Sequence, residues 1–547
     1  MVEVTPPYAM DVPLLVSSML VRTARHHRHA EIVSVCDDGI RRHRYTDCEL
    51  RARHVAQVLA ALDTTPGDRV GTLAWNDHRH YELYFGVSGY GAICHTINPR
   101  LFAEQIVHII NDAQDRFIFF SADFLPLLQS IAVHCPAVEA WIALDPVPTD
   151  THLGPLTPLD YEALLAEQDG DYTWPALDER SPAFLCYTSG TTGLPKGVIY
   201  THRSTVLHTY ATALPDSYKL SALDTVMPAV PMFHANAWES AFVATLVGAT
   251  LVLPGSKLDG ASLYRLIEAE QVTFSIGVPT IWFNLLNHVQ QQGLRFSSLH
   301  TLIVGGAATP MSTFEGYASL GVDLIQGWGM TETAALTTCS RPGAQQRGQT
   351  VDAQRQGIAM RQGRIVAGAD MRVVDDAGRE LAWGSGEAGH FQVKAPWVTA
   401  RYYRADAPAT QDGWLPTGDM AEIDADGYAR LTDRSKDVIK SGGEWISSVD
   451  LENIAADLPG VQLAACIAAT HPKWGERPVL VIQRKDDAPL NEAEVLAFFR
   501  GKVPRWSEPD AVVFIEQMPL TATGKLYKLQ LRQHYRNLLE TAAKADS

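Results

Sequence analysis

The sequence predicts an α/β protein that combines a large amino-terminal part with a small carboxy-terminal domain. Short apolar runs at residues 183–188, 301–305 and 323–326 have the character of buried strands, and a helical pattern at residues 262–270 lies among them. This alternation of strands and helices is typical of α/β folds. The 547 residues also exceed what one ordinary core accommodates, which predicts more than one domain.

Smaller units follow Asp433. Two strands and one helix are predicted there, at residues 461–469, 479–484 and 492–502. Asn491 and Glu494 have the spacing of a capping pair at the start of that helix. The boundary is a charged stretch rather than a Gly/Ser linker, which favours a defined hinge. We therefore predict an amino-terminal domain of residues 1–435 and a carboxy-terminal domain of residues 436–547.

The composition argues against several classes of function. Hydrophobic residues make up 46% of the chain and charged residues 20%, as in soluble globular proteins. The net charge of −17 argues against nucleic acid or an anionic membrane as the main partner, because both require a basic surface. If the ligands are nucleotides and carboxylates, a few cations must make the site positive at short range, where salt screens little.

The pattern of apolar residues and cysteines predicts a cytoplasmic protein. The first residues lack the profile of a signal peptide. The longest apolar stretch, residues 241–254, is shorter than the roughly 20 residues of a membrane span, so no integral membrane segment is expected. Seven scattered cysteines without a C-x-x-C pair fit a reducing compartment. Membrane association through a partner is left open.

A loop rich in glycine and hydroxyl side chains follows the strand at residues 183–188. Glycines let backbone N–H groups approach a phosphate, hydroxyls bond to its oxygens, and the lysine adds charge. The candidate phosphate-binding residues are Thr188, Ser189, Gly190, Thr191, Thr192, Gly193 and Lys196. Loops that leave the carboxyl ends of strands are where α/β sheets bind ligands. The spacing is not that of a Walker A loop, and a flexible surface loop is the alternative.

The string Tyr187-Thr188-Ser189-Gly190-Thr191-Thr192-Gly193-Leu194-Pro195-Lys196-Gly197-Val198 resembles the signature of AMP-forming acyl- and aryl-CoA synthetases, within the adenylate-forming superfamily. Further matching stretches follow in the family's order, at residues 98–101, 231–234, 327–333, 416–419, 433–446 and 521–525. The resemblance therefore covers nearly the whole chain. It implies ATP, Mg²⁺ and coenzyme A, a large domain of several subdomains, and a small mobile α+β domain.

Residues 327–333 supply further candidate nucleotide contacts. Trp328 offers a flat face for adenine, Thr331 can bond the α-phosphate, and Glu332 is a hard oxygen ligand suited to Mg²⁺. The resemblance assigns these same roles and adds Thr188 as a metal ligand. It also implies nucleotide contacts at Gly306, Ala307, Gly329 and Met330. Taken alone, a core tryptophan and a capping threonine would be the simpler interpretations.

Asp419 and Arg434 bracket the last part of the large domain. A carboxylate that accepts from two sugar hydroxyls is a usual ribose contact, and the resemblance places Asp419 there with Arg434 nearby. The alternative is an ion pair between two surface strands.

Two lysine segments of the small domain serve different half-reactions in the family. A loop lysine can offset the repulsion between a carboxylate and the α-phosphate, and the resemblance makes Lys525 this adenylation lysine. The resemblance assigns coenzyme A to the other segment, at Lys440, Gly442, Gly443 and Trp445. One site cannot easily hold pyrophosphate and a thiol together, so the family rotates the small domain, with Lys436 at the hinge position.

The acyl pocket is the least determined part of the site. The resemblance places His234, Trp238 and Gly305 along it, and a neutral histidine packed in an apolar wall fits the same position. If the segment is helical, Trp238 shares a face with His234. Glu239 is unexpected beside an apolar tunnel, and it either faces away or contacts something polar.

These motifs together predict an acid–thiol ligase that forms AMP and diphosphate, with Lys525, Thr188, Glu332 and His234 as its catalytic residues. The Gly-Gly-Glu-Trp segment is similar to that of the fatty-acyl and methylmercaptopropionyl ligase branch, which implies a short- to medium-chain fatty acid or a sulfur-containing analogue. Alternatives are an adenylating enzyme with a carrier protein or oxygen as acceptor, a ligase specific for methylmercaptopropionate, and a non-catalytic binding protein. The expected partners are small molecules, and a homodimer is left open.

Overall fold

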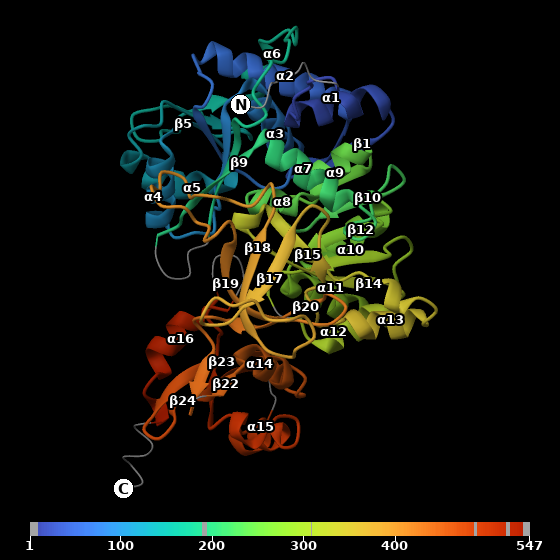
Figure 1. Cartoon of the computed structure of the whole chain (residues 1–547). Coiled ribbons are helices and arrows are strands. Elements are labelled where there is room, and N and C mark those ends of the chain that lie inside the picture. Colours follow the sequence, from blue (N-terminus) through green and yellow to red (C-terminus); the bar gives the residue numbers. More distant parts are fainter. Residues whose placement is uncertain are drawn as a thin grey trace, which may run out of the picture.

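The computed structural model describes residues 9–188, 194–307, 309–442, 444–485, 489–520 and 526–539. It has a large body built on three sheets and a small carboxy-terminal body built on a fourth (Figure 1). The small body, red in Figure 1, lies at one end of the molecule. The predicted α/β class, with its large and small parts, is confirmed.

The first large sheet has nine strands in the order β16-β15-β14-β13-β12-β10-β11-β1-β2. Their bounds are β1 (Glu31–Cys36), β2 (Gly39–Arg44), β10 (Thr225–Pro228), β11 (Thr250–Leu253), β12 (Phe274–Gly277), β13 (Thr301–Val304), β14 (Asp323–Met330), β15 (Ala335–Cys339) and β16 (Arg364–Ile365). The run from β14 to β1 is parallel, so the carboxyl ends of these strands share one edge. The strand at residue 323 continues past 326 to Met330 because its last part pairs antiparallel with β15.

The second large sheet has seven strands in the order β7-β6-β5-β3-β4-β8-β9. Their bounds are β3 (Arg69–Leu73), β4 (Ile93–Thr96), β5 (Asp115–Phe120), β6 (Ala140–Ala143), β7 (Leu159–Asp160), β8 (Pro182–Tyr187) and β9 (Gly197–Thr201). The strand predicted at residues 183–188 is β8. Because β8 pairs antiparallel with β9, the predicted phosphate loop connects two neighbouring strands.

Helices separate and cover the two large sheets. One apolar cluster contains residues of both sheets and of the helices between them, which are α1 (Val16–His26), α2 (Tyr45–Ala61), α3 (His78–Tyr90), α7 (His202–Ala213) and α9 (Ser240–Val247). The outer face of the first sheet packs against α10 (Gly260–Ala269), α11 (Pro279–Gln291) and α12 (Met311–Ser319). The outer face of the second sheet packs against α4 (Ala103–Ala113) and α5 (Leu125–Ile131). The remaining helices of the large body are α6 (Tyr161–Ala166), α8 (Ala235–Trp238) and α13 (Val351–Ile358).

The helix expected at residues 262–270 is α10, which begins two residues earlier. Asp259 caps it, because its Oδ1 accepts a hydrogen bond of 3.0 Å from the Ser262 N–H. A capping carboxylate satisfies one of the free N–H groups of the first turn, so the helix starts next to it.

The third sheet is antiparallel and has four strands, β17 (Asp370–Val374), β18 (Gly389–Lys394), β19 (Leu415–Ile423) and β20 (Ala429–Arg434). Trp328 of β14 packs into its apolar core beside Phe391 and Val393. The third sheet is therefore joined to the first one through the strand that carries the motif at residues 327–333.

The small body follows a turn between Arg434 and Ile439. It contains β21 (Ile439–Ser441), β22 (Glu444–Ile446), β23 (Val461–His471), β24 (Gly475–Arg484), β25 (Ala511–Ile515), α14 (Ser448–Ala456), α15 (Glu492–Phe499) and α16 (Lys528–Tyr535). The predicted capping pair is confirmed, since Asn491 Oδ1 accepts from Glu494 N and Glu494 Oε2 accepts from Asn491 N, both at 3.0 Å. The helix ends at Phe499 rather than 502 because Arg500 is extended and Gly501 has a φ of +77°.

All seven cysteines lie in the described residues and are free thiols. Within the described ranges, no helix has both the length and the apolar character needed to cross a membrane.

Candidate active site

A cleft of about 300 Å³ lies where the predicted phosphate loop leaves β8. Thr188 lines it from the end of β8, and His234 lines it from the loop after β10. The other lining residues are Thr96, Asn98, Leu101, Ile109, Tyr187 and Phe233. The structure therefore brings the predicted Thr188 and His234 to one cleft. Five predicted loop residues, Ser189, Gly190, Thr191, Thr192 and Gly193, lie outside the described residues.

Tyr402 connects the phosphate loop with Glu332. Its hydroxyl donates to Glu332 Oε1 at 2.7 Å, and the Lys196 Nζ lies 4.9 Å from the centre of its ring. Burial and the neighbouring carboxylate raise the pKa of Tyr402, so the hydroxyl keeps its proton and remains a donor. The adjoining chain is held at two more points, because Thr399 N donates to Glu332 O at 2.8 Å and Tyr403 N donates to Gly197 O at 2.7 Å. Sequence reasoning missed this segment.

The residues predicted to hold Mg²⁺ supply a donor set that suits it. Glu332 is buried and offers a carboxylate, and Thr188 offers a hydroxyl that accepts from Lys196 N at 3.2 Å. Hard oxygen donors of this kind are the ones Mg²⁺ prefers. Thr331 is fixed beside them, since the Tyr200 hydroxyl donates to its carbonyl at 2.6 Å.

Asp419 is tied to both Trp328 and Arg434. Trp328 Nε1 donates to Asp419 Oδ2 at 2.9 Å, and Arg434 Nε lies 2.6 Å from Asp419 Oδ1. Asp419 is only 3% exposed, so the alternative of a surface ion pair does not describe it, although Arg434 is half exposed. The Trp328 ring is buried and meets Phe391 edge-on at 4.9 Å. Trp328 is thus a core residue, and the N–H edge of its ring faces Asp419, the residue predicted to bind the ribose.

Gly305 lies between the predicted nucleotide motif and the predicted acyl segment. A Cβ atom built on it would come within 2.6 Å of the Gly327 carbonyl oxygen and 3.4 Å of the Trp238 ring. A side chain at this position would therefore push the two segments apart. Gly306 follows with a φ of +85°, and Ala307 is exposed.

The segment from Ala235 to Glu239 is not an ordinary right-handed helix, so the condition under which Trp238 would share a helix face with His234 is not met. Residues 235–239 form a left-handed turn, with φ between 38° and 64° at all five positions. None of these residues is glycine, and each non-glycine residue in this region costs about 1–2 kcal/mol. Such strain persists only where surrounding contacts impose it.

Glu239 faces inward and contacts something polar, which settles the question that the sequence left open. It is 3% exposed, and its Oε1 lies 2.9 Å from Nδ1 of the fully buried His208. Burial raises the pKa of the Glu239 carboxyl, and the hydrogen bond from His208 acts in the opposite direction. His208 was not a candidate, because nothing in its sequence context separates it from any other helix residue.

Two of the residues predicted to bind coenzyme A, Lys440 and Trp445, lie on β21 and β22 of the fourth sheet, in the small body (Figure 1). Lys440 and Trp445 face each other across the β21–β22 pair, with the Lys440 Nζ 5.5 Å from the Trp445 ring. Gly442 N donates to Trp474 O at 2.9 Å. Gly443 lies outside the described residues.

The predicted hinge lies in a tight turn. Asp437 N and Val438 N both donate to Arg434 O, at 2.8 and 3.0 Å, and Arg532 donates to the carbonyl of Lys436.

Lys525 lies outside the described residues, but Lys528 is anchored nearby in sequence. Its Nζ donates to Ser448 Oγ at 2.7 Å and pairs with Glu452 at 2.6 Å.

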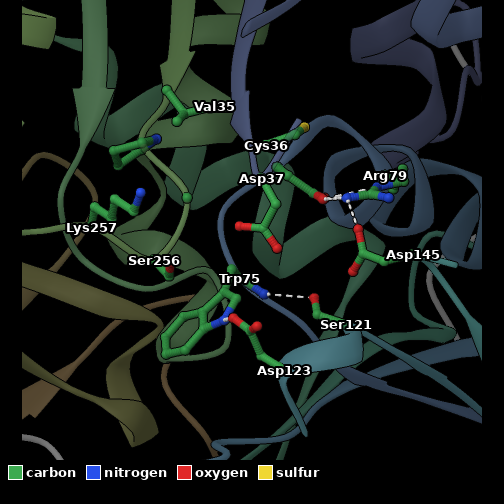
Figure 2. Close-up of a pocket in the computed structure, with 13 residues that line it drawn as sticks. Val35, Cys36, Asp37, Trp75, Arg79, Ser121, Asp123, Asp145, Ser256 and Lys257 are labelled. Atoms are coloured by element: carbon green, nitrogen blue, oxygen red, sulfur yellow. Dashed lines mark hydrogen bonds and ion pairs between the residues drawn. The ribbon is translucent and has the colours of Figure 1, made fainter. Parts of the chain in front are cut away.

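A second depression, of about 490 Å³, contains none of the predicted site residues (Figure 2). Several of its charged groups are paired, since Arg79 bridges Asp77 and Asp145, and Trp75 Nε1 donates to Asp123 at 2.8 Å. The depression is therefore a structural junction between β1, α3 and the loop after β11, and it adds nothing to the site.

Comparison with known proteins identifies related chains over the full length. The family model described as AMP-binding enzyme matches residues 20–403, and the model described as AMP-binding enzyme C-terminal domain matches residues 450–525. A 3-methylmercaptopropionyl-CoA ligase of Ruegeria lacuscaerulensis is 46% identical over 534 residues, which are 97% of this chain and 99% of that protein. A medium-chain-fatty-acid–CoA ligase of Ectopseudomonas oleovorans is 43% identical over 96% of this chain and 97% of its own.

The fold is similar to that of a solved structure. The anthranilate CoA ligase AuaEII in complex with anthranoyl-AMP superposes with a TM-score of 0.86 at 25% identity, over 98% of this chain and 99% of the other.

We predict that Gly329→Ala disrupts the motif strand. A Cβ atom at Gly329 would lie 1.3 Å from the Ala335 carbonyl oxygen, so β14 and β15 would have to separate. The free energy of unfolding should fall by at least about 3 kcal/mol. The matched control is Gly357→Ala in α13, where a Cβ meets nothing within 4 Å. That variant should lie within about 1 kcal/mol of the wild type. Equal thermal stability of both variants would contradict the close pairing.

Proposed function

The chain belongs to the family of AMP-binding enzymes and is an AMP-forming acyl-CoA ligase, and from this premise we propose that it activates a short- to medium-chain fatty acid or a thioether acid such as 3-methylmercaptopropionate. Its substrates and metal are ATP, a carboxylic acid, coenzyme A and Mg²⁺. The proposal rests on the cleft that Thr188 and His234 both line, together with the contacts of Tyr402 with Lys196 and Glu332. The acid class is inferred from the two ligases with more than 40% identity over nearly the whole chain.

In the first half-reaction, the acid carboxylate attacks the α-phosphate of ATP and pyrophosphate leaves. Both reacting groups are anions, so the main task of the protein is to position them and to offset their repulsion. We propose that Thr188, Lys196 and the loop between them bind the phosphates of ATP. Lys525 would offset the negative charge of the acid carboxylate. Tyr402 holds Lys196 and Glu332 in place through its ring and its hydroxyl.

Thr188 and Glu332 are the residues that would hold Mg²⁺, which supplies positive charge to the phosphate oxygens. Asp419 would accept hydrogen bonds from the ribose hydroxyls. Trp328 Nε1 and Arg434 Nε hold the two carboxylate oxygens and so fix the direction in which the carboxylate faces. Gly306, Ala307, Gly329, Met330 and Thr331 remain proposed nucleotide contacts. His234, Trp238 and Gly305 are the proposed wall of the acyl pocket.

In the second half-reaction, the thiol of coenzyme A attacks the acyl carbon and AMP leaves. We propose that the small domain, residues 436–547, rotates about Lys436 and presents Lys440, Gly442, Gly443 and Trp445. Trp474 and Lys473 join this surface, because Trp474 is 44% exposed and Lys473 Nζ lies 4.6 Å from its ring. An aromatic face with adjacent lysines suits the adenine and phosphates of coenzyme A.

Two further proposals concern the cellular location and the oligomeric state of the protein. The seven free cysteines fit a cytoplasmic enzyme. A homodimer is proposed as the assembly, and it is checked by the mass in solution. A carrier protein in place of free coenzyme A is the competing acceptor, and direct comparison of the two acceptors separates them.

We expect acid-dependent exchange of pyrophosphate into ATP, and turnover that peaks among short- and medium-chain or thioether acids. The measurement is the exchange rate and kcat/KM across acids of increasing chain length. Lys525→Ala should lower the exchange about 100-fold or more, while thioester formation from a supplied acyl-adenylate stays within threefold. The proposed acid class fails if only aryl acids or long chains are turned over. A chain that supports no exchange with any acid would instead be a binding protein.

Trp474→Ala should raise KM for coenzyme A about ten- to hundredfold, because stacking on one aromatic ring contributes about 1–3 kcal/mol. Pyrophosphate exchange should not change, since the first half-reaction does not use this surface. Trp383→Ala is the matched control, because Trp383 is similarly exposed at 50% but lies in the large body. A coenzyme A KM that is equal in both variants would rule out Trp474 as part of the surface.

A further inference from the structure

The left-handed turn at residues 235–239 is held by three side chains from other elements. Cys186 Sγ of β8 donates to Asn236 Oδ1 at 3.2 Å, and the Tyr218 hydroxyl donates to the Trp238 carbonyl at 2.6 Å. The third anchor is the contact of 2.9 Å between His208 of α7 and Glu239. These contacts supply the outside support that five consecutive non-glycine residues with positive φ require.

The His208–Glu239 contact has a defined hydrogen-bond pattern. His208 Nε2 lies 2.7 Å from the Leu336 carbonyl oxygen, which can only accept, so Nε2 carries a proton. On the other side, Nδ1 faces Glu239 Oε1, and a hydrogen bond joins them whether the proton is bound to Nδ1 or to Oε1. Both ring nitrogens are therefore used, and the imidazole orientation is fixed. His208 in turn connects the turn to β15, the strand that pairs with the nucleotide motif on β14.

The turn determines where Trp238 lies. The Trp238 carbonyl is held by Tyr218, and its ring faces Gly305 at the end of β13. Glu239 is the next residue, so a change in its backbone conformation would rotate the peptide that follows Trp238. The side chains of Trp238 and Glu239 are both buried, which leaves little room for either to adjust alone.

We propose that Glu239, through its buried pair with His208, is a positioning residue that determines acid specificity by holding Trp238 against Gly305. The inference rests on the proposed function, in which Trp238 and Gly305 form the wall of the acyl pocket. Glu239 itself touches no reacting atom. In this proposal the Glu239 carboxylate makes no contact with the substrate. It holds the backbone of residues 235–239 through His208, and we call this pair the clamp.

A merely structural role for Glu239 would lower stability without changing acid selection. Glu82 provides the matched control, because it is also fully buried, accepts from Arg51 at 2.7 Å and from the Tyr161 hydroxyl at 2.7 Å, and lies in α3. Glu82→Ala should lower the thermal midpoint and leave KM for the acid unchanged.

Glu239→Ala should raise KM for the preferred acid at least tenfold and flatten the chain-length profile. KM for ATP should stay within twofold and kcat should fall less than threefold. Glu239→Gln should restore the profile, because a glutamine amide N–H can donate to His208 Nδ1 while Nε2 keeps its contact with the Leu336 carbonyl. If Glu239→Ala does not fold, Tyr218→Phe is the second variant. It removes only the donor to the Trp238 carbonyl and should raise KM for the acid three- to tenfold.

The inference is overturned if Glu239→Ala and Tyr218→Phe lose thermal stability while the acid profile stays that of the wild type. Trp238→Ala separates this failure from a failure of the proposed function. If Trp238→Ala changes the acid profile and Glu239→Ala does not, the acyl pocket stands and only the clamp is wrong. If Trp238→Ala leaves the profile unchanged, the assigned pocket and the clamp are both wrong.

Discussion

The buried carboxylate of Asp419 is the contact on which the arrangement of the site depends. A charge removed from water is costly unless it is paired and hydrogen-bonded, and Asp419 meets both conditions with Arg434 and the Trp328 N–H. Trp328 belongs to the nucleotide motif on the first sheet, and Arg434 ends the last strand of the third sheet, just before the turn to the small body. One carboxylate therefore fixes the nucleotide motif relative to the start of the hinge.

A protein of net charge −17 has to attract three anionic substrates, ATP, the acid and coenzyme A, so the cations near the proposed site matter. Lys196 stands beside the Tyr402 ring, whose face attracts a cation without neutralising it. Arg434 shares its charge with Asp419 but remains half exposed. Two carboxylates of the second depression, Asp77 and Asp145, are paired with Arg79, which offsets part of their negative charge. The other cations proposed for the reaction, Lys440, Lys473 and Lys525, follow the proposed hinge in sequence and would act at short range, where screening is weak.

Local signals made the strands β8 and β13, the cap at Asn491 and the large and small parts predictable, because apolar runs and capping residues act on their immediate neighbours. Two features could not be predicted. Tyr402 reaches Glu332 across 70 residues and belongs to no recognisable motif. The left-handed turn contains no glycine, so its sequence favours an ordinary helix, and only distant anchors such as His208 and Tyr218 reverse that preference. Contacts between segments far apart in sequence override local preference in both cases.

The most direct test of this account is calorimetric binding of a non-hydrolysable acyl-adenylate analogue to the wild type and to Asp419→Asn. The amide oxygen can still accept from the Trp328 N–H, so the fold and the thermal midpoint should be largely kept. The variant loses the charge that pairs with Arg434 and that accepts from the ribose hydroxyls. The account predicts affinity at least tenfold weaker in the variant, as expected when a charged hydrogen bond worth about 1.5–3 kcal/mol is lost. Equal affinity in the two proteins would contradict the placement of the adenylate at Asp419.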